Sequence, residues 1–153
     1  MFKRRMQVEI PNEILLAEVG EILAEGKEVV LLTKGDSMNP LIRGGRDSVL
    51  LRKVPDGELK VGDVALARIA QGHFVLHRII SIVDGDVTLM GDGNVRGREH
   101  CSLNDILGVA VKVIKKSGRE VKVGRAPVWR RLGYFPRRIL LAFHRRLMFR
   151  IFK

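Results

Sequence analysis

The serine at position 37 stands in a short polar loop where it could act as a nucleophile. The segment KGDSMNP, residues 34–40, lies between two apolar runs, Val29–Leu32 and Val49–Leu51. Its glycine, aspartate, asparagine and proline are typical of a turn, but a turn requires neither Ser37 nor Met38. A serine hydroxyl becomes a useful nucleophile only when a base takes its proton and donors stabilise the developing oxyanion. Ser37 is therefore a candidate nucleophile that needs a partner base.

The residues around Ser37 suit this chemistry. Gly35 leaves room for a peptide to approach the backbone N–H groups, while Met38 and Pro40 would fix the loop by packing and by restricting φ. We therefore expect Gly35, Met38 and Pro40 on the substrate-binding side of the site. The base should have a pKa near neutrality, and His77 meets that requirement with little tuning.

Short apolar runs and turn sequences predict the frame that must position these side chains. Asn12 can cap a helix whose apolar residues recur at helical spacing up to Gly26. Beyond Gly26 the apolar runs are short and alternate with turn residues, which predicts a mainly β domain, an antiparallel and partly open β-barrel. Ser102–Gly108 is expected to form a single helical turn. The predicted strands are Val29–Thr33, Ser48–Val54, Val64–Ile69, Phe74–Val83, Val87–Met90, Val109–Lys115 and Glu120–Val123.

The positive charge is concentrated at the C-terminal end. The 153 residues include 28 Lys and Arg against 17 Asp and Glu, a formal net charge of +11. Residues 127–153 hold eight of these basic residues and no acidic one, which leaves +3 for the rest of the chain. We therefore divide the chain into an N-terminal helical segment (1–27), a β domain (28–126) and a basic tail (127–153).

Helical spacing returns in the tail and predicts a basic amphipathic helix. The apolar residues of this segment are Trp129 and Leu132 before Pro136, and then Leu140, Phe143, Leu147 and Ile151 near one stripe. Residues 128–153 would suit an anionic membrane surface or an acidic partner. They could equally pack on the β domain with their arginines in water. Nucleic acid is not an expected partner, because aromatic stacking platforms are few.

No apolar run approaches the ~18 residues that a membrane-spanning helix needs. We therefore expect no transmembrane span, and a location in the cytoplasm or at the surface of the cytoplasmic membrane. A single cysteine, Cys101, excludes an internal disulfide framework.

Four segments, in order, resemble the sequence boxes of one clan of serine peptidases, the signal peptidases and SOS-repressor autoproteases. KGDSMNP resembles the nucleophile box, Val61–Ala67 the x-Gly-Asp-hydrophobic strand entry, and Leu89–Asn94 the Gly-Asp-x-Asn box beside the active site. Leu76–Ile80 resembles the His-Arg box of the signal peptidases of the endoplasmic reticulum. The resemblance covers roughly residues 30–112. It implies the β fold of the signal peptidases and of the repressor C-terminal domains.

The resemblance also assigns roles to residues. It implies that Ser37 is the nucleophile and His77 the general base, where most bacterial signal peptidases have a lysine. No lysine occurs between Val61 and Val111, so a lysine base is not expected. In the relatives that use histidine, a second acid follows the Gly-Asp-x-Asn box, and the matching position here is Arg98 with Glu99 adjacent.

The third member of the site stays open between several alternatives. Asp92 could orient the imidazole or only brace its loop, Glu99 competes with it, and a serine-histidine dyad without an acid would also work. Asp36 is interpreted as a hydrogen-bonding residue of the loop. His73, His77, His100 and Cys101 match no compact zinc motif, so no metal and no cofactor are expected.

These residues predict a serine endopeptidase that removes a leader or signal segment from a peptide or protein precursor. The resemblance implies a substrate that binds as an added β-strand with small residues before the cut. Self-cleavage is not expected, because residues 1–36 contain neither an Ala-Gly nor a Cys-Gly pair. The alternative is a catalytically inactive peptide-binding β module whose basic tail binds an anionic membrane, nucleic acid or an acidic partner.

Overall fold

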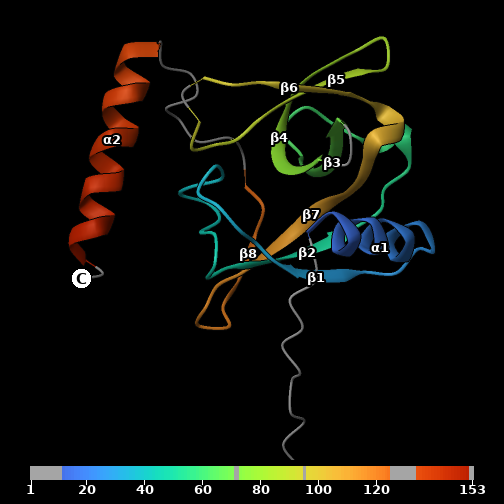
Figure 1. Ribbon diagram of the computed structural model, residues 1–153, viewed down its shortest axis with the longest axis horizontal. Coiled ribbons are helices and arrows are strands. Elements are labelled where there is room, and N and C mark those ends of the chain that lie inside the picture. Colours follow the sequence, from blue (N-terminus) through green and yellow to red (C-terminus); the bar gives the residue numbers. More distant parts are fainter. Residues whose placement is uncertain (1–11, 71–72, 95, 125–133, 152–153) are drawn as a thin grey trace, which may run out of the picture.

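The computed structural model describes residues 12–70, 73–94, 96–124 and 134–151 of the chain (Figure 1). Its two helices are α1 (Asn12–Ala24) and α2 (Tyr134–Ile151), and short 3₁₀ turns lie at Asp56–Glu58 and Leu103–Asp105. The strands found within these ranges are β1 (Val29–Leu32), β2 (Ser48–Arg52), β3 (Val64–Ala70), β4 (His73–Val83), β5 (Asp86–Met90), β6 (Glu99–Ser102), β7 (Ile106–Ile114) and β8 (Glu120–Lys122).

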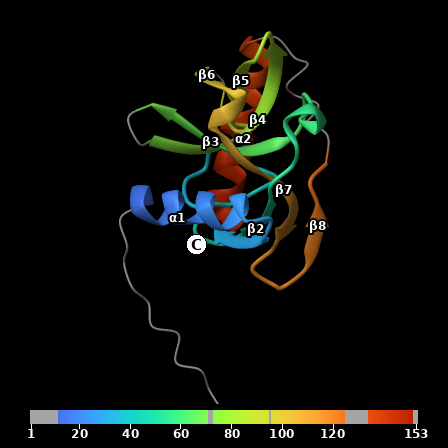
Figure 2. The ribbon, with the colours of Figure 1, turned by 90° about the vertical axis from the view of Figure 1, so that its right-hand side faces the viewer.

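The strands form one antiparallel sheet that curls into a half-barrel (Figure 1). Its order is β1-β2-β7-β3-β4-β5-β6, and β8 pairs with β7 beside this path. The register shifts between Leu50 and Leu51 in β2 and between Ile79 and Ser81 in β4. Such irregularities bend a strand and increase its twist, which helps the sheet to curl. Helix α1 packs against β1, β4 and β7 at one end of the sheet (Figure 2).

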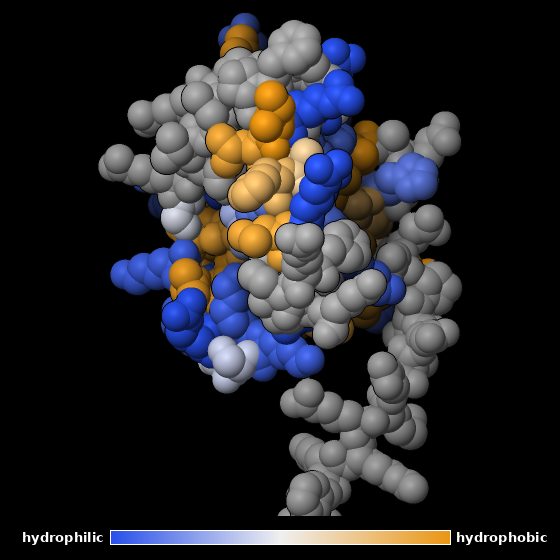
Figure 3. Space-filling view, turned by 90° about the vertical axis from the view of Figure 1, so that its left-hand side faces the viewer, coloured by the Kyte–Doolittle hydropathy of each residue, from blue (hydrophilic) through white to orange (hydrophobic). Residues whose placement is uncertain are grey.

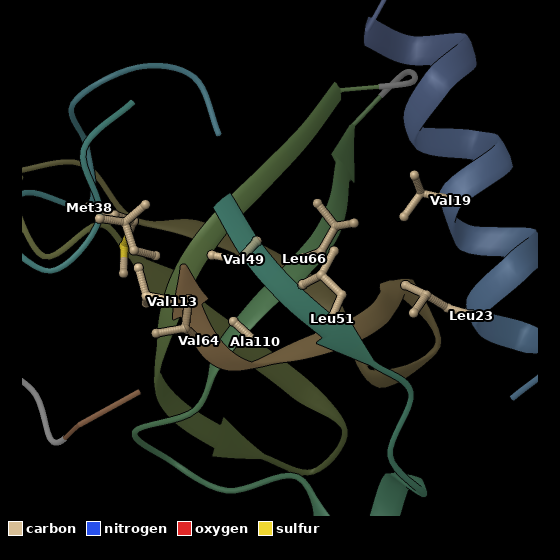
Figure 4. Packing of buried hydrophobic residues seen from close by; sticks show 10 residues of the cluster. Val19, Leu23, Met38, Val49, Leu51, Val64, Leu66, Ala110 and Val113 are labelled. Carbon is tan, nitrogen blue, oxygen red and sulfur yellow. The ribbon is translucent and has the colours of Figure 1, made fainter. Parts of the chain in front are cut away.

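The first four residues of strand β3, Val64–Ala67, are buried on both faces of the sheet, which explains why all four are apolar before Arg68 is reached. Val64 and Leu66 belong to one hydrophobic cluster, whereas Ala65 and Ala67 belong to a second cluster on the other face. In the first cluster, side chains of α1 lie at one end and Met38 lies at the other (Figure 4). The loop that carries Ser37 is thus anchored to the same core as the N-terminal helix.

Helix α1 begins at Asn12 and ends two residues before Gly26, as its sequence predicts. Val19 and Leu23, four residues apart, are buried on the face that meets the sheet. Gly26 has a φ of +82°, and its N–H donates to Leu23 O over 2.9 Å. This positive φ ends the helix and turns the chain into β1.

The seven predicted strands are confirmed, and one strand was not predicted. Strand β6 contains Glu-His-Cys-Ser, which has no apolar run, and only Cys101 of its residues is buried. The helical turn expected over Ser102–Gly108 is shorter than predicted: it is a 3₁₀ turn at Leu103–Asp105, and Ile106 already belongs to β7. The apolar residues of that segment are explained by strand pairing, since Ile106 pairs with Ala67 of β3.

Helix α2 agrees with the helix expected in the basic tail from Pro136 onward. The expected segment around Trp129 and Leu132 lies outside the described residues. Leu141 is buried, and Arg145 Nη2 donates to Gly93 O over 3.2 Å, so α2 contacts the β domain near the loop that follows β5. Neither α1 nor α2, the helices of the described ranges, is long and apolar enough to cross a membrane.

Candidate active site

The loop between β1 and β2, residues 33–47, is closed at its base by hydrogen bonds. Asp47 O accepts the N–H of Thr33 over 3.1 Å and its hydroxyl over 2.8 Å, and Gly45 N donates to Thr33 O over 2.7 Å. Within the loop, a Cβ at Gly44 would overlap the backbone of Gly35, which has a φ of +73°. Both glycines are therefore required for the loop to fold back on itself.

Ser37, His77 and Glu99 are joined by a chain of hydrogen bonds. Ser37 Oγ lies 2.9 Å from His77 Nε2, and His77 Nδ1 lies 2.8 Å from Glu99 Oε2. His77 stands on β4 and Glu99 is the first residue of β6, with β5 between them. The side chain of His77 is 7% exposed and that of Glu99 is 22% exposed. The structure thus brings together three side chains from three separate parts of the sequence.

The order of these contacts fixes the protons of the imidazole. A carboxylate accepts hydrogen bonds only, so the N–H of the neutral ring lies on Nδ1 and Nε2 keeps its lone pair toward Ser37 Oγ. The serine hydroxyl then donates to Nε2, the arrangement in which a base can take its proton during attack. When the ring becomes an imidazolium, Glu99 stabilises its charge. The arrangement is capable of nucleophilic acyl transfer.

Asp92 is held by Arg78, the residue next to His77. Arg78 Nε donates to Asp92 Oδ1 over 2.8 Å, and Arg78 Nη2 donates to Asp92 Oδ2 over 2.7 Å. Arg78 Nη1 also donates to the carbonyls of Gly62 and Gly124, over 2.7 and 2.8 Å. Both side chains are buried, so this bidentate pair ties the loop after β5 to strand β4.

The loop after β5, residues 91–94, packs backbone to backbone on the loop of residues 33–47 that carries Ser37. Gly93 N donates to Ser37 O over 2.7 Å. A Cβ at Gly91 would overlap Ser37 O, and a Cβ at Gly93 would lie 2.7 Å from Asp36 O. The Gly-Asp-Gly-Asn sequence therefore has a spatial reason: its glycines admit the Ser37 loop, and Asp92 anchors the segment through Arg78.

The residues expected on the substrate side of the site differ in their positions. Met38 is 4% exposed, lies in the core and accepts the N–H of Asp92 at Sδ over 3.4 Å. Its side chain therefore anchors the loop, and any substrate contact from Met38 would come from its backbone. Gly35 is exposed, and Pro40 is half-buried after a cis peptide bond. Asp36 accepts Asn39 Nδ2 at Oδ1 over 3.3 Å, as expected for a hydrogen-bonding residue of the loop.

A basic cavity of about 520 Å³ lies between the loop of residues 33–47 and the turn after β7. It is lined by Pro40, Arg43, Arg46, Asp47, Lys115, Lys116, Ser117 and Arg119. Asp47 is its acidic residue, and Asp47 Oδ2 accepts Lys115 Nζ over 2.8 Å. Burial alone would raise the pKa of Asp47, but hydrogen bonds from Lys115 and the Arg43 N–H, with the Lys115 charge, together lower that pKa below its ordinary value.

Of the two acids expected as candidates, the structure places Glu99 against His77 and engages the Asp92 carboxylate with Arg78. The sequence left this choice open because β6 was not predicted. Pairing of β6 with β5 puts Glu99 opposite Leu89, one strand away from Ile79 of β4. The alternation in Glu-His-Cys-Ser, with Cys101 directed inward, was the available signal for a strand.

Within the described ranges, no three His, Cys, Asp or Glu side chains gather as metal ligands would. His100 Nδ1 lies 3.2 Å from Thr88 Oγ1 on the neighbouring strand. Cys101 is buried, and burial, with the nearby charges of Asp105 and Asp86, raises the pKa of its thiol to about 11. This thiol is therefore a poorer candidate nucleophile than the hydroxyl of Ser37.

No protein-family model matches the chain, and no curated protein sequence matches it either.

Proposed function

We propose that the protein is a serine endopeptidase of the signal peptidase type, with Ser37 as nucleophile and His77 as general base. The observation that carries this proposal is the continuous contact from Ser37 Oγ through the imidazole to Glu99, at 2.9 and 2.8 Å. A structural serine in a turn would gain nothing from a buried imidazole that a carboxylate orients. The half-barrel is consistent with the signal peptidase fold, which forms part of the proposal.

The reaction would follow the general course of serine acyl transfer. Ser37 Oγ attacks the carbonyl carbon of the scissile bond while His77 Nε2 takes the hydroxyl proton, and Glu99 stabilises the imidazolium. The N–H of Ser37 and a neighbouring N–H of the loop would hold the oxyanion. His77 then gives its proton to the departing amine, and a water molecule, deprotonated by His77, releases the acyl group from Ser37.

The substrate would be an extended peptide, a leader or signal segment of a precursor, with small residues before the cut. Strand β1 lies at one end of the strand order and leads directly into the Ser37 loop. Its Val30 and Leu32 are 58% and 56% exposed. A peptide that pairs with this edge would be directed along β1 toward Ser37, as in β-strand addition.

The test is cleavage of a mixed library of unstructured peptides, read by mass spectrometry. Wild-type protein should cut after small residues, and Ser37→Ala, which keeps the loop and the fold, should not cut. Equal cleavage by Ser37→Ala would overturn the proposal. Peptides that bind both proteins and remain intact would instead identify an inactive peptide-binding module.

A further inference from the structure

One face of helix α2 is turned toward the catalytic loops. Leu141 on this face is 5% exposed, and Arg145, four residues later, donates to Gly93 O. Residues four apart lie on the same side of a helix, so this side faces the β domain. Gly93 in turn donates its N–H to Ser37 O. The contact therefore joins α2 to the nucleophile loop through a single glycine.

The other side of α2 exposes a contiguous apolar surface, which we call the α2 stripe. Its members are spaced so that they share one side of the helix, and each is between 45% and 69% exposed: Ile139, Leu140, Phe143 and Leu147. Figure 3 faces the α2 side of the molecule and shows a hydrophobic band bordered by hydrophilic atoms. Single exposed apolar residues are ordinary, whereas a contiguous stripe marks an interaction surface.

The charge of α2 selects the kind of surface that the α2 stripe would meet. The helix sequence contains five arginines and no acidic residue, and the exposed Arg146 lies next to the stripe, three residues after Phe143. A second copy of the chain would bring arginines against arginines, which is unfavourable. Nucleic acid would satisfy the arginines and leave the apolar side chains in water. An anionic lipid bilayer offers phosphate groups above an apolar layer and so satisfies both.

We propose that α2 lies in the interface of an anionic bilayer, with the α2 stripe among the acyl chains and Arg146 at the lipid phosphates. This proposal depends on the surface of α2 and is separate from the peptidase proposal. Where both hold, the contact between Arg145 and Gly93 places the Ser37 loop beside the bilayer. A precursor whose leader lies on the membrane would then be presented close to Ser37.

The experiment is sedimentation of the full chain with phosphatidylcholine vesicles, with and without phosphatidylglycerol. Wild-type protein should sediment with the anionic vesicles and stay in solution with the neutral ones. Leu140→Gln/Phe143→Gln should weaken partitioning at least about tenfold, because two apolar side chains no longer enter the bilayer. The matched control is Val61→Gln/Val83→Gln, which changes two side chains that are each 61% exposed elsewhere and should partition as wild type does.

A second pair of variants tests the charge. Arg138→Gln/Arg146→Gln should also weaken binding, and added salt should reduce wild-type binding. The proposal is overturned if wild-type protein does not sediment with anionic vesicles, or if Leu140→Gln/Phe143→Gln sediments with them to the same extent as wild type. It is also overturned if α2 mediates a lipid-free dimer that this variant abolishes. Reaction of Ser37 with a fluorophosphonate, measured without lipid, reports the peptidase proposal independently of every one of these results.

Discussion

His77 and Arg78 are neighbours on β4, and their side chains hold two different acids. His77 Nδ1 lies 2.8 Å from Glu99, whereas Arg78 forms a buried bidentate pair with Asp92. Successive side chains of a strand point to opposite faces, so one strand orients the imidazole and also fixes the loop of residues 91–94. The two acids therefore have different partners: Asp92 holds the loop of residues 91–94 through Arg78, and Glu99 alone would take part in the proposed chemistry of Ser37.

Glu99→Gln should slow the reaction of Ser37 by roughly 10²–10⁴-fold, because an amide no longer favours the required imidazole tautomer or stabilises the imidazolium. The rate at which a fluorophosphonate phosphonylates Ser37 reports this effect. It is measured under conditions in which both proteins are fully folded. Glu120→Gln, which alters an exposed pair with Lys112, is the matched control and should react as wild type does. A wild-type rate for Glu99→Gln would indicate a serine-histidine dyad that needs no acid.

Asp92→Asn should act on stability instead. Removing one charge of a buried ion pair leaves Arg78 uncompensated and costs about 3–5 kcal/mol of unfolding free energy. Urea unfolding measures this cost. Asp36→Asn is the control, since Asp36 is exposed and its substitution should change the stability by less than about 0.5 kcal/mol. An Asp92→Asn protein of wild-type stability would contradict the anchoring role.

Gly93→Ala should separate the two loops of the site, because its Cβ would lie 2.7 Å from Asp36 O. We expect acylation of Ser37 to slow by roughly 10–100-fold while the circular dichroism spectrum is retained, since small displacements of reacting groups are costly. Gly57→Ala is the control: a Cβ there meets nothing within 4 Å. Equal rates for the two variants would show that the close approach of the loops is not needed.

Asp47 should make the fold sensitive to acid. Its pKa is lowered in the folded chain from the ordinary value of 3.8. The ion pair with Lys115 therefore stabilises the fold fully at pH values above 3.8. This stabilisation is lost as the pH falls through the lowered pKa. The stability difference between wild type and Asp47→Asn, from urea unfolding, should therefore be largest near about pH 7 and shrink toward about pH 3. A difference that is constant over this range would contradict the role of the ion pair.

The sequence predicted the parts of this structure that depend on apolar patterning. The residues Val64–Ala67 at the start of β3 are all apolar because both faces of the strand are buried there. Strand β6 was not predicted because Cys101 is its only buried side chain, so its sequence has no apolar pattern. Its pairing with β5 joins residues that are distant in the sequence. The position of Glu99 beside His77 depends on that pairing, so the sequence left two acids in competition.

The α2 stripe shows a second limit of sequence patterning. Periodicity identified an amphipathic helix around Leu140, Phe143 and Leu147, but an apolar stripe can face the core or the solvent. Among residues 138–147 of the helix, Leu141, outside the expected stripe, is buried, while Leu140, Phe143 and Leu147 are exposed. The burial of Leu141 and the contact of Arg145 with Gly93 show which side of the helix meets the β domain.

The most direct test of the catalytic assignment is fluorophosphonate labelling of the purified chain, with the modified residue mapped by mass spectrometry. Wild-type protein should carry one phosphonyl group, and it should be on Ser37. Ser37→Ala should not be labelled, and His77→Ala should be labelled only at the slow rate of an unactivated serine. Labelling of Ser37 at the same rate in His77→Ala and wild type, or no labelling of wild type at any pH between about 5 and 9, would contradict the assignment.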